Sequence, residues 1–409
     1  MTRHYSPKDF FRQMPKKLLE RFFAADGVLA DFDFPAMKDG KTDALFAAWL
    51  ALPDAERKPI DAVFSDIFDM SCEKGFKAIL TETPHQFKDQ PEKIPEFVDM
   101  LSALPNHFER AMTTYLDYPN FWKAANRFYH ADTLSSHWRK RKNLPHKLAA
   151  VDAASIARLE AAIGGYFHYK EGRGKNCAVE PYRRGALDYY FAFPEDYSQQ
   201  EPEWVNGVFT PRPHTPAFMV IFIYSQQDGS LDIHYQGSHK AIQPLQTMFA
   251  VIMLGLDELP PDPKDERVYE LGPLLQKNFD FAPAVGSGIE NVVVKKLRLS
   301  SRVKKGERIT LEADTSLDPK AIYTLIDKIG KSTPLHLYNV TLVELSASVV
   351  MDDKPPRNVA IRITHPNSCS LKYDELDHKL RDMLADAGIE LKELAEDAQA
   401  PVATEPVEA

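Results

Sequence analysis

The chain has 409 residues, 44% of them hydrophobic and 27% charged, which is the composition of an ordinary globular protein with room for more than one domain. Its longest apolar runs, 218–224 and 248–256, fall short of the roughly 18 residues that a membrane-spanning helix needs, so we expect no contact with a membrane. The first residues lack an apolar stretch of the signal-peptide kind, and the three cysteines lie too far apart for a disulfide framework. Together these features favour a cytoplasmic protein.

Residues 1–164 are predicted to form an all-helical domain. Ser6 and Pro7 are residue types that begin helices, and Pro15 interrupts the apolar stripe that follows them. From apolar residues at helical spacing, further helices are expected at 42–53, 60–80, 91–104, 106–118 and 152–164. The last of these is expected to end at Gly164.

Residues 165–256 are predicted to form a mixed sheet-and-helix domain with aromatic and basic strands. The segments from residue 166 onward are rich in aromatic and β-branched residues, which are typical of strands. The Asp-Gly turn at 228–229 predicts a hairpin. Alternation within 231–235 predicts one buried face and one solvent face that carries Asp232 and His234, and a helix at 241–255 should cover the buried face.

A proline-rich, charged linker at 257–267 leads to an α+β domain at 265–391. Strands are expected at 291–299, 307–314, 337–350 and 358–364, helices at 318–330 and 374–391, and a disordered acidic tail at 392–409. Strands and helices do not alternate regularly along the chain. The predicted fold class is therefore α+β and multidomain, with a helical N-terminal domain followed by two mixed α/β domains whose sheets are largely antiparallel.

The charges of the chain are strongly segregated. The net charge is −9, yet residues 137–147 carry +5 and residues 295–308 carry +6, which leaves −20 on the remainder. Because a local potential acts over about a Debye length, roughly 8 Å, such basic segments determine the partners of a protein more than its average charge does. The competing interpretation is that these cations are solvated or pair with acids of the same chain.

Three basic segments predict a surface for DNA or RNA. The first, at 137–142, is expected to be an exposed helix or loop, so that replacing its cations should barely change stability. In the second, at 166–191, aromatic residues alternate with cations around a Gly-Arg-Gly-Lys turn at 172–175, whose amides could approach a phosphate. The third segment, at 295–308, should form a basic tip between two strands. The predicted contact residues are Arg139, Lys140, Arg141, Lys142, Lys170, Arg173, Lys175, Arg183, Arg184, Lys295, Lys296, Arg302, Lys304 and Lys305.

Catalytic signatures are missing from the sequence. It contains no phosphate loop of the GxxxxGK kind, no GxGxxG, no HExxH and no GxSxG. The acids most suited to a divergent metal-dependent phosphodiesterase are Glu180, Asp188, Glu195 and Asp196, near the glycine-rich turn. His234 and His239 lack the further ligands that zinc requires. We therefore predict no catalytic residue, no metal and no cofactor, and leave enzymatic activity open.

The function predicted first is a non-catalytic cytoplasmic subunit that engages nucleic acid or acts as an adaptor in a larger assembly. Other protein subunits are the expected partners, and a bacterial antiviral defence system is the kind of assembly that such a chain would suit. The alternative is a metal-dependent nuclease. A second alternative is a protein–protein scaffold with no role in nucleic-acid binding.

Overall fold

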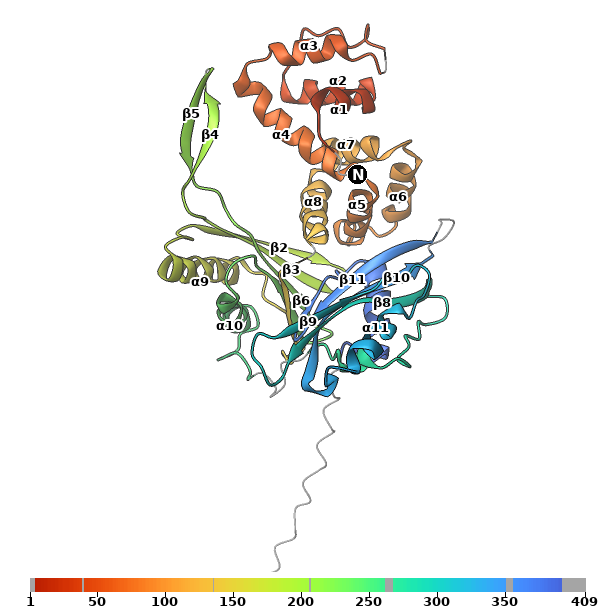
Figure 1. Cartoon of the computed structure of the whole chain (residues 1–409). Coiled ribbons are helices and arrows are strands. Elements are labelled where there is room, and N and C mark those ends of the chain that lie inside the picture. The colour runs from red at the N-terminus through yellow and green to blue at the C-terminus, as the bar shows by residue number, and fades with distance from the viewer. Residues whose placement is uncertain are drawn as a thin grey trace, which may run out of the picture. The chain divides into compact units, whose positions relative to one another are not determined.

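The computed structural model describes residues 4–391 apart from 39, 135, 206, 262–267 and 351–355. The predicted acidic tail at 392–409 and the start of the predicted third domain lie outside the described residues. The chain divides into two compact units (Figure 1). The first, called here the helical unit, comprises Met1–Leu134 and Tyr182–Leu187; the second, the sheet unit, comprises Ser135–Pro181 and Asp188–Ala409.

The helical unit is built from short helices that prolines and turns separate. They are α1 (Pro7–Gln13), α2 (Lys16–Asp26), α3 (Asp43–Ala51), α4 (Asp54–Met70), α5 (Glu73–Gln86), α6 (Lys93–Ala103), α7 (His107–Asp117) and α8 (Pro119–Thr133). The single helix predicted at 60–80 is two helices, because the extended Cys72 caps α5 and the chain turns sharply before it. A Cβ on Gly75 would lie 2.0 Å from the carbonyl oxygen of Met70, so only glycine fits this turn.

Aromatic residues form the core of the helical unit, and Phe64 of α4 lies at its centre. The ring centroids of five other residues lie 4.6–5.8 Å from that of Phe64, namely Phe10, Phe11, Phe22, Phe23 and Trp49. All of these rings are buried. Edge-to-face and tilted aromatic contacts of this kind stabilise a core beyond the area that they bury.

The first sheet of the sheet unit has the strand order β1-β7-β6-β3-β2. Its strands are β1 (Trp138–Arg141), β2 (Cys177–Arg184), β3 (Leu187–Pro194), β6 (Val220–Ser225) and β7 (Ser230–His234). The predicted hairpin turn at 228–229 is confirmed, since β6 and β7 pair antiparallel on either side of it. The predicted helix at 241–255 is also confirmed as α10 (Ile242–Ile252), whose Phe249 packs on Tyr190, Phe222 and Tyr224 of this sheet.

Helix α9 (Ala153–Glu171) differs from the prediction in length. It was expected to end at Gly164, with strand-forming residues from 166 on, but it continues to Glu171 and ends at Gly172 in the left-handed conformation. Gly164 does not end the helix. It lets the loop after α9 pack closely against the helix, because a Cβ at this position would lie 2.8 Å from the carbonyl oxygen of Gly174. The close approach of this loop to the helix explains why a glycine in mid-helix is tolerated.

A separate two-stranded ribbon connects β3 to β6. It consists of β4 (Gln199–Val205) and β5 (Val208–His214), which pair with each other and with no other described strand. The ribbon is called the arm below, and it stands out from the five-stranded sheet in Figure 1.

The second sheet has the order β12-β11-β10-β8-β9. Its strands are β8 (Ile289–Ser301), β9 (Arg308–Glu312), β10 (Tyr338–Val349), β11 (Arg357–Thr364) and β12 (Ser368–Cys369), and its helices are α11 (Ala321–Gly330) and α12 (Glu375–Asp386). Short 3₁₀ turns lie at His239–Ala241, Gly272–Leu275 and Leu335–Leu337. The strands and helices predicted for this part of the chain are present, but the helix predicted to run to residue 391 ends at Asp386, two residues before Gly388 in the left-handed conformation.

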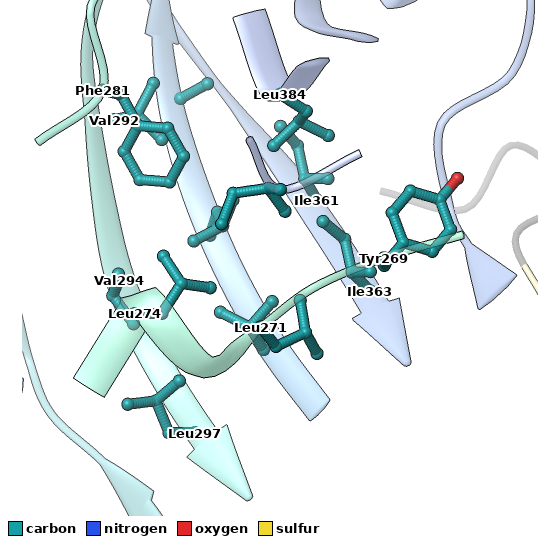
Figure 2. Packing of buried hydrophobic residues seen from close by; sticks show 14 of the residues in the cluster. Tyr269, Leu271, Leu274, Phe281, Val292, Val294, Leu297, Ile361, Ile363 and Leu384 are labelled. Atoms are coloured by element: carbon teal, nitrogen blue, oxygen red, sulfur yellow. The ribbon is translucent and has the colours of Figure 1, made fainter. Parts of the chain in front are cut away.

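One face of the second sheet is apolar and covered. Figure 2 shows Val294 and Leu297 of β8 and Ile363 of β11 on the side where Leu274 and Leu384 pack. Every one of these residues is buried. The two sheets join where the backbone N–H of Lys140 in β1 donates to the carbonyl oxygen of Asn367, 3.0 Å away, next to β12.

The predicted α+β class with antiparallel sheets is confirmed, since the strand pairs whose register is described are antiparallel. In the part of the chain that the structure describes, no helix has the length and apolar character needed to cross a membrane.

Candidate nucleic-acid interface

The first basic segment is a buried strand. It was predicted to be an exposed helix or loop, and that prediction is wrong, because residues 138–141 pair with β7 as strand β1. Lys140 is buried, and its Nζ lies 3.2 Å from Oε1 of Glu390. Lys142 donates to the carbonyl oxygen of Leu391 and lies 3.9 Å from the same carboxylate.

Two other cations of this segment also have partners within the chain. Arg141 is buried and donates to Oε1 of Gln246 and to the carbonyl oxygen of Pro260. Arg139 is half-buried, which lowers its pKa, and it donates to the carbonyl oxygen of Trp138. The expectation that replacing these cations would barely change stability assumed exposed side chains. Because Lys140 and Arg141 are buried and donate to acceptors within the chain, we expect their removal to destabilise the fold.

Glu390 is the centre of this network. Besides Lys140 and Lys142, it accepts from Nη1 of Arg381 at 3.2 Å, and Arg381 also donates to the hydroxyl of Tyr269. Burial raises the pKa of the Glu390 carboxyl, but the surrounding cations outweigh burial and lower that pKa to about 2. The network joins β1 to the C-terminal end of the described chain, and we interpret it as structural.

The prediction that one face of strand β7 is exposed to solvent is also wrong. Asp232 and His234 were expected on a solvent face, yet both are buried, because Tyr373 and Lys372 pack over that face. The hydroxyl of Tyr373 donates to Asp232. The Nζ of Lys372 lies 4.8 Å from the ring centroid of Trp138 and has no hydrogen-bond acceptor among the described residues. Burial lowers the pKa of this amine to about 8, against the attraction of Asp232.

Arg173, in the glycine-rich turn, holds the root of the arm. Its guanidinium lies 2.7 Å from Glu171 and 2.8 Å from Asp196, and 4.0 Å from the ring centroid of Phe218. It also donates to the hydroxyl of Tyr235. The guanidinium of Arg173 is thus bound by two carboxylates and stacked against an aromatic ring, so it is not available to a phosphate.

The backbone N–H groups of both glycines in this turn also donate hydrogen bonds within the chain. The N–H of Gly172 donates to the carbonyl oxygen of His168, and that of Gly174 donates to the carbonyl oxygen of Glu195. Lys175 is exposed beside them, and Lys170 is exposed at the end of α9. Of the predicted contacts in this turn, only the exposed Lys175 is placed to meet a ligand in solution.

The tip of the β2–β3 hairpin belongs to the helical unit. Arg184 is buried, and its Nη1 lies 2.8 Å from both carboxylate oxygens of Asp132. Its guanidinium also lies 5.2 Å from the ring centroid of Phe128. Arg183 is exposed, and its Nε donates to the carbonyl oxygen of Gly185. An Arg184 held by a bidentate carboxylate is an anchor of the tip.

Glu82 of α5 lies in the same part of the helical unit and is fully buried. One carboxyl oxygen accepts from Nε2 of Gln86 at 2.7 Å, and the other has no hydrogen-bond partner among the described residues. Burial raises the pKa of Glu82 to about 7, although Gln86 and the positive charge of Arg184 oppose the change. Nothing in the sequence marks this glutamate as buried.

The third basic segment has the predicted form. Strand β8 ends at Ser301 and β9 begins at Arg308, so the cations between them lie at a tip, and this placement is confirmed. Arg302, Lys304 and Lys305 are exposed. Lys304 lies 3.2 Å from Glu307. Glu307 also accepts from the hydroxyl of Tyr338, so this acid of the tip is already engaged on two sides.

The polar face of the second sheet continues this basic tip. Lys296 lies opposite both Glu344 and Glu312 in the strand register, with Nζ 2.8 Å from Glu312, while Lys295 is exposed at an irregularity of β8. Three arginines are added by β8, β9 and β11: Arg298, Arg308 and Arg362. Burial lowers the pKa of Arg298, and the positive charges of Arg308 and Arg362 lower it further.

We call Arg298, Arg302, Lys304, Lys305, Arg308 and Arg362 the arginine face. Arg298, Arg308 and Arg362 were not among the contact residues predicted from the sequence. Their signal was present in the alternation of their predicted strands, which puts them on the face opposite the apolar residues. What could not be known is that β8, β9 and β11 bring them together with the tip.

The structure offers little support for the alternative prediction, a metal-dependent nuclease site. Among the residues that the structure describes, no three His, Cys, Asp or Glu side chains are grouped so as to hold a metal ion. Asp196 pairs with Arg173, and Glu195 accepts from the side chain of Asn176 at 2.6 Å. Burial raises the pKa of the Cys177 thiol to about 12, which keeps it protonated and poorly nucleophilic.

Comparisons with models of known protein families and with curated proteins found no match to this chain.

Proposed function

We propose that this protein is a non-catalytic subunit that binds nucleic acid through the arginine face, without sequence preference. The observation that carries the proposal is the gathering of five exposed cations and the half-buried Arg298 on one sheet face and tip, in a chain whose net charge is −9. Arg298 is close enough to Arg308 and Arg362 for their charges to lower its pKa, and a phosphate between such side chains would relieve that repulsion.

The chemistry of the face favours the phosphate backbone as its ligand. Guanidinium groups bind phosphates in a bidentate manner, and the major groove of DNA admits a two-stranded ribbon such as β8 and β9 form at their tip. The neighbouring aromatic residue, Tyr338, is already bonded to Glu307 and is not offered to a base. Contacts to phosphates position a protein on nucleic acid but carry no sequence information.

The proposal narrows the predicted set of contact residues. Lys140, Arg173 and Arg184 pair with acids of the chain and have side chains at most 13% exposed. Lys304 and Arg362 also pair, with Glu307 and Glu344, but remain 78% and 61% exposed, so the affinity should depend on the third basic segment and its sheet face. We expect non-specific binding in the range of about 1–100 µM at physiological salt.

The test is the salt dependence of binding to a duplex and to a single strand, measured by fluorescence anisotropy with the full-length chain. The triple variant Arg302→Ala, Lys305→Ala and Arg308→Ala should reduce the slope of log K against log salt by about 2–3, because each phosphate contact contributes about 0.9.

A matched control removes three exposed lysines of the helical unit, Lys74, Lys88 and Lys93, with the same loss of charge. It should leave the slope unchanged. Equal loss in both triple variants would show that only net charge matters, and absence of binding by the wild-type chain at low salt would favour the scaffold without a nucleic-acid role.

A further inference from the structure

Arg298 of β8 has no charged residue directly opposite it on either neighbouring strand. In the register it lies opposite Thr310 of β9 and Leu342 of β10. Lys296 is two residues away and therefore on the same face, but it lies opposite a glutamate on both of these strands. The two cations occupy equivalent places in the sheet, and only Lys296 is neutralised by its neighbours.

The guanidinium of Arg298 has no carboxylate partner among the residues that the structure describes. Its side chain makes one hydrogen bond to them, from Nε to Oγ1 of Thr341 at 3.3 Å. Burial lowers the pKa of Arg298, and the charges that add to this effect, those of Arg308 and Arg362, are both positive. A half-buried cation without a counterion is costly, and an anion in contact with its two Nη groups offsets that cost.

A bulge in β10 supplies the hydroxyl that holds Arg298. The pairing of β10 with β8 shifts between Val340 and Leu342, so Thr341 is an extra residue with no register partner on β8. Its Oγ1 accepts from Nε of Arg298 and lies 2.8 Å from the hydroxyl oxygen of Ser300. Bulges often re-aim a side chain beside a functional site. This one fixes the guanidinium through Nε and leaves Nη1 and Nη2 to a ligand.

The free edge of the guanidinium fits a phosphate group. Nη1 and Nη2 form a planar fork that matches two oxygens of an anion. Arg308 is the diagonal neighbour of Arg298 on this face, since it lies opposite Ser300, and such positions are about 7–8 Å apart. A tetrahedral phosphate can bind both arginines through different oxygens, whereas a carboxylate has only two oxygens, in one plane. The pair therefore favours phosphate over an acidic side chain.

We infer that Arg298 is a phosphate-binding subsite of the arginine face, with Arg308 as its second cation and Thr341 as its positioning residue. The inference rests on the proposed function and deepens it, because one fixed phosphate position sets where a bound strand lies on the sheet. The phosphate belongs either to a polynucleotide backbone or to a smaller phosphorylated molecule, and the experiment separates these sources.

The first measurement is the affinity of the full-length chain for a fluorescent oligothymidylate without a terminal phosphate. Arg298→Lys keeps the charge but loses the planar fork, so affinity should fall about tenfold or more at every salt concentration. The slope of log K against log salt should not change, because the number of cations is the same. The matched control is Arg302→Lys at the exposed tip, which should bind like the wild type.

The second measurement tests the role of Thr341. Thr341→Val removes the hydroxyl at nearly constant volume and changes no charge, so it should weaken binding several-fold, whereas Thr341→Ser keeps the hydroxyl and should restore the affinity. Failure of the serine variant to restore binding would refute the positioning role.

The third measurement identifies the source of the phosphate by hydrogen exchange on peptides from β8 and β10. Millimolar inorganic phosphate is compared with chloride at equal ionic strength. If the subsite takes small phosphorylated molecules, phosphate should increase protection in the wild type but not in Arg298→Lys. If it takes only a backbone, phosphate should have no such effect, while Arg298→Lys still weakens oligonucleotide binding.

Two outcomes would overturn the subsite while leaving the proposed function intact. One is an Arg298→Lys variant that binds the oligonucleotide as tightly as the wild type, and the other is equal loss in Arg298→Lys and Arg302→Lys. A wild-type chain that binds no oligonucleotide at low salt refutes the proposed function. The subsite then survives only if inorganic phosphate protects β8 and β10 in the wild type and not in Arg298→Lys.

Discussion

Replacing Glu82 with glutamine should stabilise the helical unit, and only above a defined pH. Burial raises the pKa of this carboxyl from 4.5 to about 7. The unfolded chain therefore releases the proton of Glu82 at a lower pH than the folded chain does. Folding stability is highest below about pH 4.5, falls as the pH rises to about 7, and stays low above it.

The size of the effect follows from the shift. A change of one pKa unit corresponds to 1.36 kcal/mol, so a rise from 4.5 to about 7 corresponds to a loss of about 3 kcal/mol above pH 7. A glutamine side chain at this position cannot ionise, and its carbonyl oxygen can still accept from Gln86. Glu82→Gln should therefore recover up to about 3 kcal/mol at pH 8 but less than about 1 kcal/mol at pH 5, where the unfolded chain has only begun to release the proton.

The assay is hydrogen exchange of the full-length chain, read by mass spectrometry on peptides from α5 and α8 and corrected for the intrinsic rate at each pH. It reports the free energy of opening of these helices without requiring the whole chain to unfold in one step. The control is Glu96→Gln, which changes an exposed glutamate of α6 and should alter protection by only a few tenths of a kcal/mol.

A difference between variant and wild type that does not change with pH would refute the reasoning. So would a loss of protection in Glu82→Gln at pH 8, since that would mean that the ionised carboxylate and Arg184 attract each other more strongly than burial penalises the charge.

Two further predictions concern the sheet unit. Gly164→Ala should destabilise the chain by about 1–3 kcal/mol, because its Cβ would lie 2.8 Å from the carbonyl oxygen of Gly174, whereas Gly165→Ala, with nothing within 4 Å, should stabilise α9 by up to about 1 kcal/mol. Thermal unfolding followed by circular dichroism checks both, and equal shifts would contradict the packing role of Gly164. Burial lowers the pKa of Lys372 from 10.5 to about 8, so stability should rise with pH between those values. Lys372→Met should abolish that rise and add up to about 3 kcal/mol at pH 7, and a lower urea midpoint for this variant would count against it.

Local patterns in the sequence predicted most of the elements. Hydrophobic periodicity located α3, α7 and α11 and the strands β8 to β11 of the second sheet, and the Asp-Gly turn located the β6–β7 hairpin. The turn between β8 and β9 likewise put Arg302 and its neighbours at a tip. Such patterns work because helices and strands repeat their contacts every few residues, and a turn depends on two or three residues alone.

Local patterns failed where a distant partner decides the environment. The dense charge of 137–142 is typical of an exposed segment, but β1 lies between β7 and the chain near β12. The two glycines in α9 are typical of a helix end, yet the helix continues through both, and Gly164 makes room for the loop that contains Gly174. Asp232 and His234 alternate with apolar residues as solvent-facing side chains do, but both are buried, because Tyr373 donates to Asp232 and the ring of Trp138 contacts that of His234.

Thus the sequence by itself determined the α+β class, most of the helices and strands, and the basic tip between β8 and β9. The tertiary structure alone decided which cations are available to a ligand. Lys140 and Glu390 are 250 positions apart, and Arg184 and Asp132 are 52 apart, so no local repeat connects the members of either pair. Each pair forms only because folding removes both charges from water together, and a buried cation must then take the carboxylate that the fold places beside it.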